Sequence, residues 1–518
     1  MLHQQFPSAR QTMRLLALGL IFLFQCVCLN ASRATSGHVI LVCPPAFTDA
    51  MQPWIAQRQS EGLSITTIQP PTSGQELRTE IQKKATGETR YVLLVGDAPV
   101  IGQPTDPSRQ TPILYARTTV TAKWGSTPTL SSDMLYGDLD GDLIPEAAVG
   151  RLPVDRVSQL KTWITRILTR ERSDDFGPWR SRVQVVGGVG GFGKIADTAI
   201  ESVTRSIVTG MLPTDTRTHI CYASPEHPFC PDHTSFTDAI LDNYSKGSRF
   251  WVYAGHGQVT ELDRVAPSLG GKAVLDGDSV QRFVTDPNNA PIALILACFT
   301  GACDASEDSI AEQMVLNERG PVAVFAGSRI TMPYGNTTAA VGLINGVFHQ
   351  KLPRLGDAWL SALGEMQTEQ TAPDATGRIM IDALATLISP SGTKLSDERR
   401  EHMLLYNLLG DPTLRLQHPE PLELTRTANE GDLNSLQLTV TSPISGHLAI
   451  TVDRPLGAVK NGDANNTLLL ETKAVAVAAQ SQQVNLKIPA GIAGPVVIRA
   501  MVSGDDSWAS AAIRTILN

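Results

Sequence analysis

The 518-residue sequence is poor in net charge, in cysteine and in long hydrophobic runs. Lys and Arg number 43 against 51 Asp and Glu, and this net charge of −8 argues against a nucleic-acid-binding protein, which needs a basic surface. Seven cysteines are too few for a disulfide-dense scaffold, and 42 Gly with 33 Pro exclude a collagen-like or wholly disordered chain. At roughly 100–200 residues per domain, the length predicts about three domains.

The N-terminus is the one place where a sustained hydrophobic run occurs. Arg10 and Arg14 precede an apolar segment over residues 15–29, which is typical of a secretory signal peptide and shorter than the roughly 20 residues of a membrane span. We therefore expect residues 1–34 to be removed, and the mature chain, without a membrane span, to be exported to the periplasm, the cell surface or the extracellular space. An uncleaved anchor and a lipoprotein signal at Cys26 are the alternatives.

Short apolar, β-branched runs alternate with helical patterns over most of the remaining sequence. Their order is that of an α/β fold with parallel sheets covered by helices. After residue 419 the pattern changes to short strands separated by turns, which is typical of an antiparallel sandwich of the immunoglobulin-like kind. The predicted domains are an N-terminal α/β subdomain (35–178), a catalytic α/β subdomain with a second parallel sheet (179–418) and the sandwich (419–518).

Two predicted buried strands end in residues that carry chemistry. Residues 249–257 (RFWVYAGHG) place His256 between two glycines after one strand, and residues 291–304 (PIALILACFTGACD) place Cys298 after another. Since the carboxyl ends of parallel strands lie at one edge of a sheet, the thiol and the imidazole can form a Cys/His dyad there. The backbone N–H groups of Gly257 and Cys298 are the expected oxyanion donors. A core thiol and a structural histidine are the alternative interpretation.

Several separate blocks, in one order along the chain, resemble the gingipain-type cysteine peptidases, which are secreted relatives of the caspases. The resemblance extends over about residues 38–416, and it implies a caspase-like α/β catalytic region followed by an immunoglobulin-like domain. The blocks are YVLLVGD (91–97), DMLYGDLDGDLIPEAAVGRLPV (133–154), YAGHG (253–257), LACFTGACD (296–304), GPVAVFAGSRIT (320–331) and YNLLGDPTLRL (406–416).

The resemblance implies a role for each matching residue. Cys298 corresponds to the nucleophile and His256 to the general acid/base, while an upstream acidic residue orients the imidazole. Glu146 in PEAAVGR is the first candidate for that acidic residue and Asp142 a weaker one; for Glu146, a solvated carboxylate at a strand start is the alternative. The implied reaction is thiolate attack on a protein or peptide substrate, formation of an acyl-enzyme and hydrolysis, with no cofactor required.

The best-known family members cleave after Arg or Lys, and this preference does not carry over to the present sequence. No acidic specificity residue can be assigned, since Asp155, Asp263 and Asp304 are only nearby along the chain. A sortase-like transpeptidase shares every catalytic residue with a hydrolase of this kind. A non-enzymatic surface protein on a peptidase scaffold is a further alternative.

Three aspartates alternate with other residues in an acidic loop, at Asp138, Asp140 and Asp142. Hard cations such as Ca²⁺ prefer several carboxylate and carbonyl oxygens, so we expect a structural calcium here, although the EF-hand pattern is not met. A solvated acidic turn is the alternative.

Two further patterns lie in the second α/β subdomain. Cys221 and Cys230 flank a Pro-containing loop, and in an oxidising compartment they are predicted to form a disulfide, with two free thiols as the alternative. Residues 188–193 (GVGGFG) follow a strand and precede a helix, but no acidic residue follows at the distance of about 20 residues that a dinucleotide site needs. A tight turn is therefore predicted there.

Overall fold

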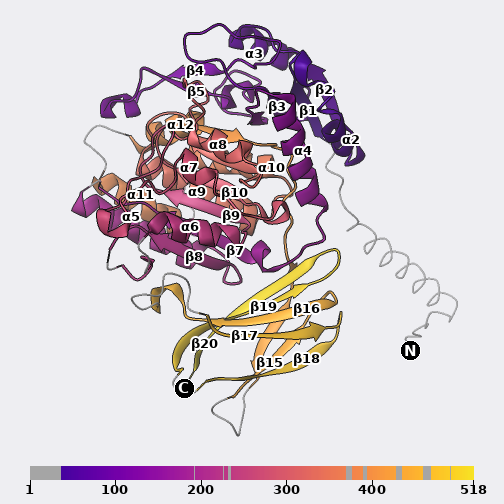
Figure 1. Cartoon of the computed structure of the whole chain (residues 1–518), viewed down its shortest axis with the longest axis vertical. Helices are drawn as coiled ribbons and strands as arrows, with labels where there is room; N and C mark the ends of the chain where they lie inside the picture. Colours follow the sequence, from indigo (N-terminus) through magenta and orange to yellow (C-terminus); the bar gives the residue numbers. More distant parts are fainter. Residues whose placement is uncertain are drawn as a thin grey trace, which may run out of the picture.

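An α/β region and a smaller all-β region lie at opposite ends of the molecule in the computed structural model (Figure 1). The described residues are 37–191, 193–225, 227–231, 235–368, 376–388, 394–427, 435–458, 468–489 and 492–517. The predicted signal peptide (1–34) and Cys26 lie outside them. Among the described helices, none combines the length and the apolar character that crossing a membrane requires.

One sheet of ten strands forms the centre of the α/β region, instead of the two separate sheets that the sequence predicted. Its strands are β1 (Gly37–Val42), β2 (Leu63–Ile68), β3 (Thr89–Val95), β6 (Ala148–Leu152), β7 (Arg182–Gly187), β8 (Arg217–Tyr222), β9 (Phe250–Ala254), β10 (Ile292–Leu296), β11 (Ala323–Gly327) and β12 (Tyr406–Leu409). Their spatial order is β2-β1-β3-β6-β12-β11-β10-β9-β7-β8. Strands such as β1 are buried along their whole length, which explains their uninterrupted apolar sequences.

The two halves of this sheet run in opposite directions. Strand β12 is antiparallel to β11, where Val324 pairs with Leu409, and parallel to β6, where Leu409 pairs with Arg151. Within each half, neighbouring strands are parallel. The start of β6 therefore lies at the same edge of the sheet as the ends of β9 and β10.

Helices cover both faces of the sheet. They are α2 (Gln52–Ser60), α3 (Gly74–Lys84), α4 (Val157–Arg172), α5 (Lys194–Ser206), α6 (Phe236–Ser245), α7 (Gly277–Val280), α8 (Ile310–Leu316), α9 (Pro333–Ile344), α10 (Leu355–Gln367), α11 (Thr376–Ile388) and α12 (Leu395–Leu405). Successive residues of β1 point to opposite faces. Val39 and Leu41 join the core that includes α2 and α4, whereas Ile40 and Val42 join the core beneath α3.

The C-terminal region is a sandwich of two sheets. Its strands are β13 (Glu420–Pro421), β14 (Glu423–Thr427), β15 (Ser435–Thr441), β16 (Gly446–Asp453), β17 (Leu468–Ala476), β18 (Ser481–Lys487), β19 (Gly494–Ser503) and β20 (Trp508–Leu517). One sheet has the order β13-β20-β19-β16-β17 and the other β14-β15-β18. Alternate residues of β15, namely Leu436, Leu438 and Val440, are buried in the core of the sandwich. An immunoglobulin-like topology stays a prediction.

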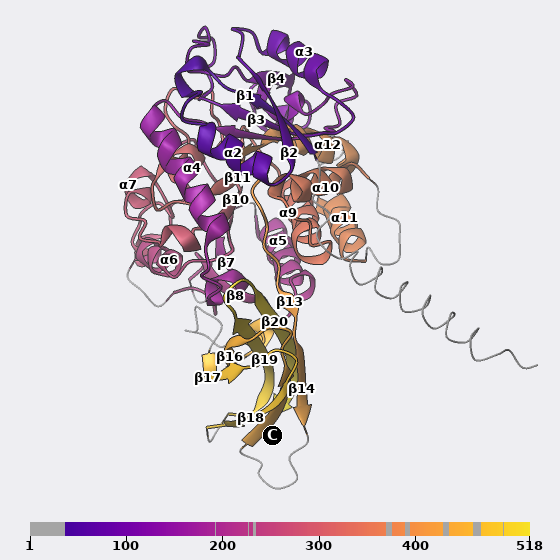
Figure 2. The same ribbon diagram turned by 90° about the vertical axis from the view of Figure 1, so that its right-hand side faces the viewer.

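The sandwich packs below the β7–β8 end of the large sheet (Figure 2). Phe176 of the α/β region forms an apolar cluster with Met501 and Trp508. Arg217 of β8 and Arg499 of β19 both pair with the buried carboxylate of Asp453, at 3.3 and 2.9 Å. These contacts join the two regions through apolar packing and a shared ion pair.

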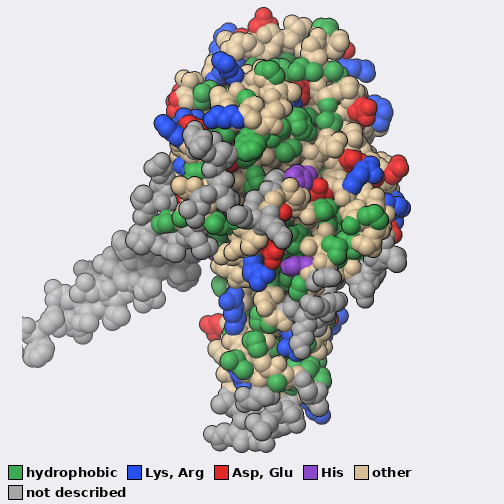
Figure 3. Space-filling model, turned by 90° about the vertical axis from the view of Figure 1, so that its left-hand side faces the viewer, with side chains coloured by type: hydrophobic (Ala, Val, Ile, Leu, Met, Phe, Trp, Pro, Cys, Tyr) green, Lys and Arg blue, Asp and Glu red, His purple; other side chains and the backbone are tan. Residues whose placement is uncertain are grey.

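Charged side chains of both signs are scattered over the described residues visible in Figure 3, and the Lys and Arg side chains among them do not form one continuous patch. Hydrophobic side chains also reach the surface, among them Trp124, which is 48% exposed. Trp124 belongs to a short 3-10 helix over Thr121–Trp124, between the small strands β4 (Leu114–Arg117) and β5 (Thr129–Ser132).

Candidate active site

Two neighbouring parallel strands end in register at one edge of the sheet. Ala254, the last residue of β9, pairs with Leu296, the last residue of β10. His256 and Cys298 each follow two residues later, and both line one cavity of about 830 Å³. The structure thus brings the thiol and the imidazole, which the sequence places after two strand ends, to a shared cavity.

The sulfur of Cys298 lies against the backbone of Thr331. The Thr331 N–H donates to Sγ at 3.3 Å, and the Thr331 carbonyl oxygen lies 3.6 Å from Sγ as an acceptor for the thiol. Burial raises the pKa of the Cys298 thiol, and the hydrogen bonds of Thr331 counteract this rise. A reactive thiolate therefore needs further stabilisation by a positive charge, such as a protonated imidazole.

A sharp turn follows Cys298. Phe299 has a φ of 61°, which is unusual for a residue with a side chain, and its N–H donates to the Arg329 carbonyl at 3.0 Å. Gly257 faces this turn closely, because a Cβ atom at Gly257 would lie 2.9 Å from the Cys298 carbonyl oxygen and 2.6 Å from Cγ2 of Thr300. Only glycine therefore fits where the two strand ends meet.

The imidazole of His256 is held by a backbone carbonyl. Its Nε2 lies 2.9 Å from the Gly190 oxygen, and because a carbonyl only accepts, Nε2 carries the proton in this contact. The backbone of the loop is held by Asp263, whose Oδ2 accepts the His256 N–H at 3.1 Å, the Tyr253 hydroxyl at 3.1 Å and the Val189 N–H at 3.0 Å. Asp263 is therefore engaged in shaping the loop rather than in receiving a substrate side chain.

The structure does not bring Glu146 together with His256, contrary to its predicted role. Glu146 lies two residues before β6, at the same edge, but three strands separate β6 from β9 and neighbouring strands are about 4.8 Å apart. Its carboxylate accepts the Leu139 N–H at 2.8 Å. The prediction failed because the sequence could not show that the turn around Gly190, rather than the segment before β6, reaches the imidazole.

The acidic loop gathers three carboxylates, with one change from the predicted set. Oxygens of Asp138, Asp140 and Glu146 lie within 4.8 Å of one another, whereas Asp142 lies outside this group. Burial and the neighbouring acidic residues raise the pKa of Glu146. Asp138 already accepts a hydrogen bond from the Arg78 guanidinium at 2.5 Å, so its charge is balanced within the protein. A structural calcium stays a prediction.

Cys221 and Cys230 are free thiols in the structure, so the predicted disulfide is not formed there. The buried sulfur of Cys221 accepts a hydrogen bond from the Asn243 side chain at 3.2 Å. Backbone hydrogen bonds close the loop instead, from Tyr222 N–H to the Phe229 carbonyl at 3.0 Å and from Cys230 N–H to a carbonyl within the loop at 2.9 Å.

Other sequence candidates have structural partners. Asp304 is buried and forms an ion pair with Arg329 at 2.5 Å, which leaves its carboxylate unsuited to a specificity pocket. Cys303, the second cysteine of the block 296–304, is also buried, and burial raises the pKa of its thiol well above the ordinary value. The contacts of Thr331 and Gly190 were not predicted from the sequence. Their signals were the block GSRIT and the glycine-rich turn, both of which follow strands of the same half of the sheet.

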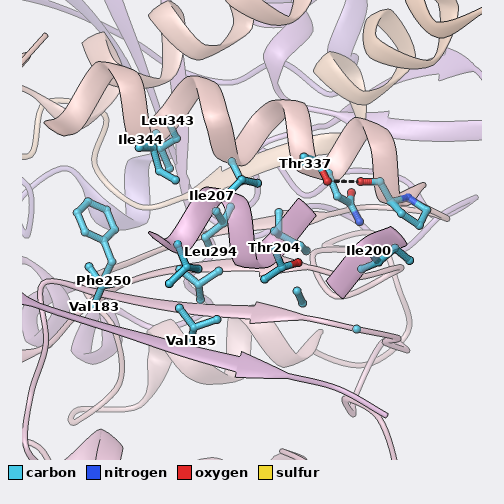
Figure 4. Close-up of a pocket in the computed structure, with 18 of the residues that line it drawn as sticks. Val183, Val185, Ile200, Thr204, Ile207, Phe250, Leu294, Thr337, Leu343 and Ile344 are labelled. Carbon is cyan, nitrogen blue, oxygen red and sulfur yellow. Dashed lines mark hydrogen bonds between the residues drawn. The ribbon is translucent and has the colours of Figure 1, made fainter. Parts of the chain in front are cut away.

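A second, mostly apolar cavity of about 170 Å³ adjoins the candidate active site. It lies between the sheet and α9, and Figure 4 shows Leu294 and Val185 of the strands on one side and Leu343 of α9 on the other. Ile200 of α5 and Pro333 of α9 line both cavities. Both helices therefore contribute residues to the wall between the two cavities.

An α/β fold that presents a thiol and an imidazole at one cavity fits the class of cysteine peptidases, and comparisons with known proteins agree. The model of Peptidase family C25 matches residues 32–417. A search of curated protein sequences finds no match. The chain belongs to Peptidase family C25 and is a cysteine-type peptidase, as its resemblance to the gingipains implied.

Solved structures show the same fold. Gingipain R (RgpB), described as an Arg-specific cysteine proteinase, superposes with a TM-score of 0.54 at 15% identity, covering 93% of this chain and 99% of that chain. The complex of the pro- and mature domains of RgpB from Porphyromonas gingivalis gives 0.54 at 16% identity, covering 92% and 100%. Another structure, described only as a protease, gives 0.55 at 13% identity, covering 93% and 98%.

Proposed function

We propose that this peptidase is an exported endopeptidase that hydrolyses peptide bonds through a Cys298/His256 dyad and a thioester acyl-enzyme. The observation that carries the proposal is the register of β9 and β10, which delivers His256 and Cys298 to one cavity, each two residues after a paired strand end. Export rests on the predicted signal peptide alone.

In the proposed reaction, Nδ1 of His256 accepts the proton of the Cys298 thiol. The sulfur attacks the substrate carbonyl carbon, and the electron pair of the C=O bond moves to oxygen, where N–H groups of Gly257 and Cys298 stabilise the charge. Phe299 is a poorer donor because its N–H already donates to the Arg329 carbonyl. The intermediate then expels the amine, which takes the proton from Nδ1, and leaves a thioester.

Hydrolysis of the thioester completes the cycle. His256 accepts a proton from water, the hydroxyl attacks the thioester carbon, and the carboxylic acid leaves as the Cys298 thiolate is released. Throughout, the Nε2–H of His256 donates a hydrogen bond to the Gly190 carbonyl, which holds the ring in this tautomer. This carbonyl occupies the position that an acidic side chain fills in a Cys/His/Asp arrangement.

We expect an electrophilic peptide probe to label Cys298 covalently, and labelling to fall by about 100-fold or more in a His256→Ala variant, because general-base assistance contributes about that much. Mass spectrometry of the tryptic peptide with Cys298 measures this directly. Asp155→Ala, an exposed change outside the cavity, is the control that should label normally. Equal labelling of the His256→Ala variant would contradict the dyad.

A peptide hydrolase and a transpeptidase differ in the nucleophile that attacks the acyl-enzyme, which is water in the first and an amine in the second. If water is the acceptor, an added amine such as a glycine peptide changes the product of peptide cleavage only slightly, and the free carboxylic acid dominates. Liquid chromatography with mass spectrometry of the products measures the ratio. A dominant amide product at millimolar amine would replace the proposed hydrolase by a transpeptidase, with the same dyad.

A further inference from the structure

Helix α12 carries three buried titratable side chains next to the cavity, which Glu398 itself lines, and the proposed mechanism uses none of them. Glu401 accepts N–H groups of residues 119–121, Glu398 accepts the Gly335 N–H at 3.0 Å, and His402 contacts the Met332 N–H at 2.7 Å. Each of these partners belongs to a segment that contributes to the wall of the cavity. Of the three, His402 has the shortest hydrogen-bonded connection to the Cys298 sulfur, because its partner Met332 directly follows Thr331, whose backbone contacts that sulfur.

The two hydrogen bonds of His402 determine its tautomer. Nε2 faces the N–H of Met332, so this nitrogen is an unprotonated acceptor. Nδ1 lies 2.8 Å from the Glu398 carbonyl oxygen, which only accepts, so Nδ1 carries the proton. Burial lowers the pKa of His402 to about 4, which keeps the imidazole neutral at neutral pH. Both ring nitrogens of this 0% exposed side chain are therefore satisfied.

The peptide that His402 holds also faces the Cys298 sulfur. The N–H of Met332 and the C=O of Thr331 belong to one planar trans peptide and point in opposite directions. With its N–H directed at His402, this peptide directs its carbonyl at Sγ of Cys298, 3.6 Å away. The preceding N–H, that of Thr331, donates to the same sulfur at 3.3 Å.

Two more sets of contacts hold the segment around Thr331 and Met332 in place. A Cβ at Gly335 would lie 2.2 Å from the His402 ring, so the helix start packs directly on the imidazole. The Asn336 amide donates to Oγ1 of Thr331 at 3.0 Å, and Tyr406 donates to the Asn336 oxygen at 2.7 Å. The turn around Thr331 is thus held from two sides, by His402 and by Asn336.

We propose that His402 is a positioning residue for the nucleophile, because it fixes the Thr331–Met332 peptide and thereby the two backbone groups that contact the Cys298 sulfur. This inference rests on the proposed function of Cys298 as the nucleophile. His402 touches neither substrate nor sulfur; it acts through the backbone of residues 331 and 332.

The test measures the pH profile of Cys298 alkylation by iodoacetamide, followed by mass spectrometry of the peptide that contains Cys298. In His402→Asn, the shorter amide keeps the bond to the Glu398 carbonyl and loses the one to Met332. We expect its alkylation at pH 7 to fall about tenfold, because a misaligned donor no longer stabilises the thiolate. His402→Gln, which can accept from Met332, should stay within about threefold of the parent chain.

His38→Asn is the matched control for general destabilisation. His38 is also buried, its imidazole bonds to the hydroxyls of Thr89 and Thr66 at 2.7 and 2.8 Å, and it lies in β1, away from the cavity. This variant should leave the alkylation profile of Cys298 unchanged. A folded His402→Asn variant with the parental profile, or an equal change in His38→Asn, would overturn the proposal.

Two further measurements apply where His402→Asn fails to fold. His402→Leu introduces an apolar side chain of similar size and removes both hydrogen bonds of the ring, so it should show the same loss of alkylation rate. Nitrogen NMR of the parent chain should show the proton on Nδ1 of His402 at neutral pH; a proton on Nε2 overturns the proposal without any variant. Alkylation measures the Cys298 thiol independently of turnover, so failure of the proposed function, seen as retained peptidase activity in Cys298→Ala, is distinguishable from failure of the His402 proposal, seen as an unchanged alkylation profile.

Discussion

Peptidase activity should fall by a factor on the order of 10⁴ to 10⁶ in kcat/KM when Cys298 is replaced by alanine, because removal of a nucleophile that acts as a unit with its base eliminates nearly all covalent catalysis. The substitution replaces the CH2SH side chain by a methyl group in a cavity wall, so the fold should persist. Circular dichroism and the thermal midpoint Tm should match those of the parent chain, and the loss should appear in peptide hydrolysis alone.

Cys303→Ala is the matched control for this experiment. Cys303 lies in the same block of sequence, but it is 3% exposed, and burial raises the pKa of its thiol well above the ordinary value. Activity of this variant should stay within about threefold. Loss of activity in Cys303→Ala together with retention in Cys298→Ala would exchange the roles of the two thiols and refute the assignment of the dyad.

The second large expected effect is a loss in the free energy of unfolding when the buried Arg329–Asp304 ion pair is broken. Arg329→Leu leaves the Asp304 carboxylate buried without its cation, and breaking a buried pair in this way costs about 3–5 kcal/mol. Arg329 and Asp304 are 6% and 1% exposed, and their closest N–O distance is 2.5 Å. A fall in Tm by several degrees in differential scanning calorimetry is the expected result.

An exposed ion pair of the same length provides the control. Arg282 and Asp238 are also 2.5 Å apart, but their side chains are 51% and 50% exposed. Arg282→Leu should therefore change the free energy of unfolding by less than about 1 kcal/mol. If both variants lowered Tm equally, burial of the Arg329–Asp304 pair would not be the reason for the effect.

The pH dependence of the Arg329 variant gives a second check. Burial by itself raises the pKa of Asp304, but the hydrogen bonds and charge of Arg329 outweigh burial and hold the pKa below its usual value. The pair therefore contributes stability above the unfolded-state pKa of about 3.9, and this contribution is lost as the pH falls through the lower folded-state pKa. The difference in Tm between the parent chain and Arg329→Leu should narrow towards acid pH.

Arg329 takes part both in the buried ion pair and in the turn that follows the proposed nucleophile. The backbone carbonyl of Arg329 accepts the N–H of Phe299, the residue with positive φ directly after Cys298. Backbone conformations of this kind persist where surrounding contacts determine them. The Arg329–Asp304 pair is one such contact, because Asp304 lies in the same turn region, six residues after Cys298.

The local sequence by itself determined that the Cys298 thiol and the His256 imidazole follow strand ends at one edge of the sheet. A buried, β-branched run followed by a glycine turn defines a strand end within a few residues, and parallel strands share an edge. His256 and Cys298 could therefore be placed together from residues 249–257 and 291–304 alone, and the blocks that resemble gingipains gave the enzyme class that Peptidase family C25 confirms.

Only the tertiary structure decided which groups surround these two residues. The Gly190 carbonyl reaches His256 and the Thr331 backbone reaches Cys298 from segments 66 and 33 residues away in sequence. Glu146 instead belongs to the acidic loop, because the strand order separates β6 from β9 by three strands. Strand order and the contacts between distant backbone groups depend on the packing of the whole sheet. Short-range sequence patterns therefore place the two residues of the proposed dyad at strand ends, but they do not determine the hydrogen-bond partners of these residues.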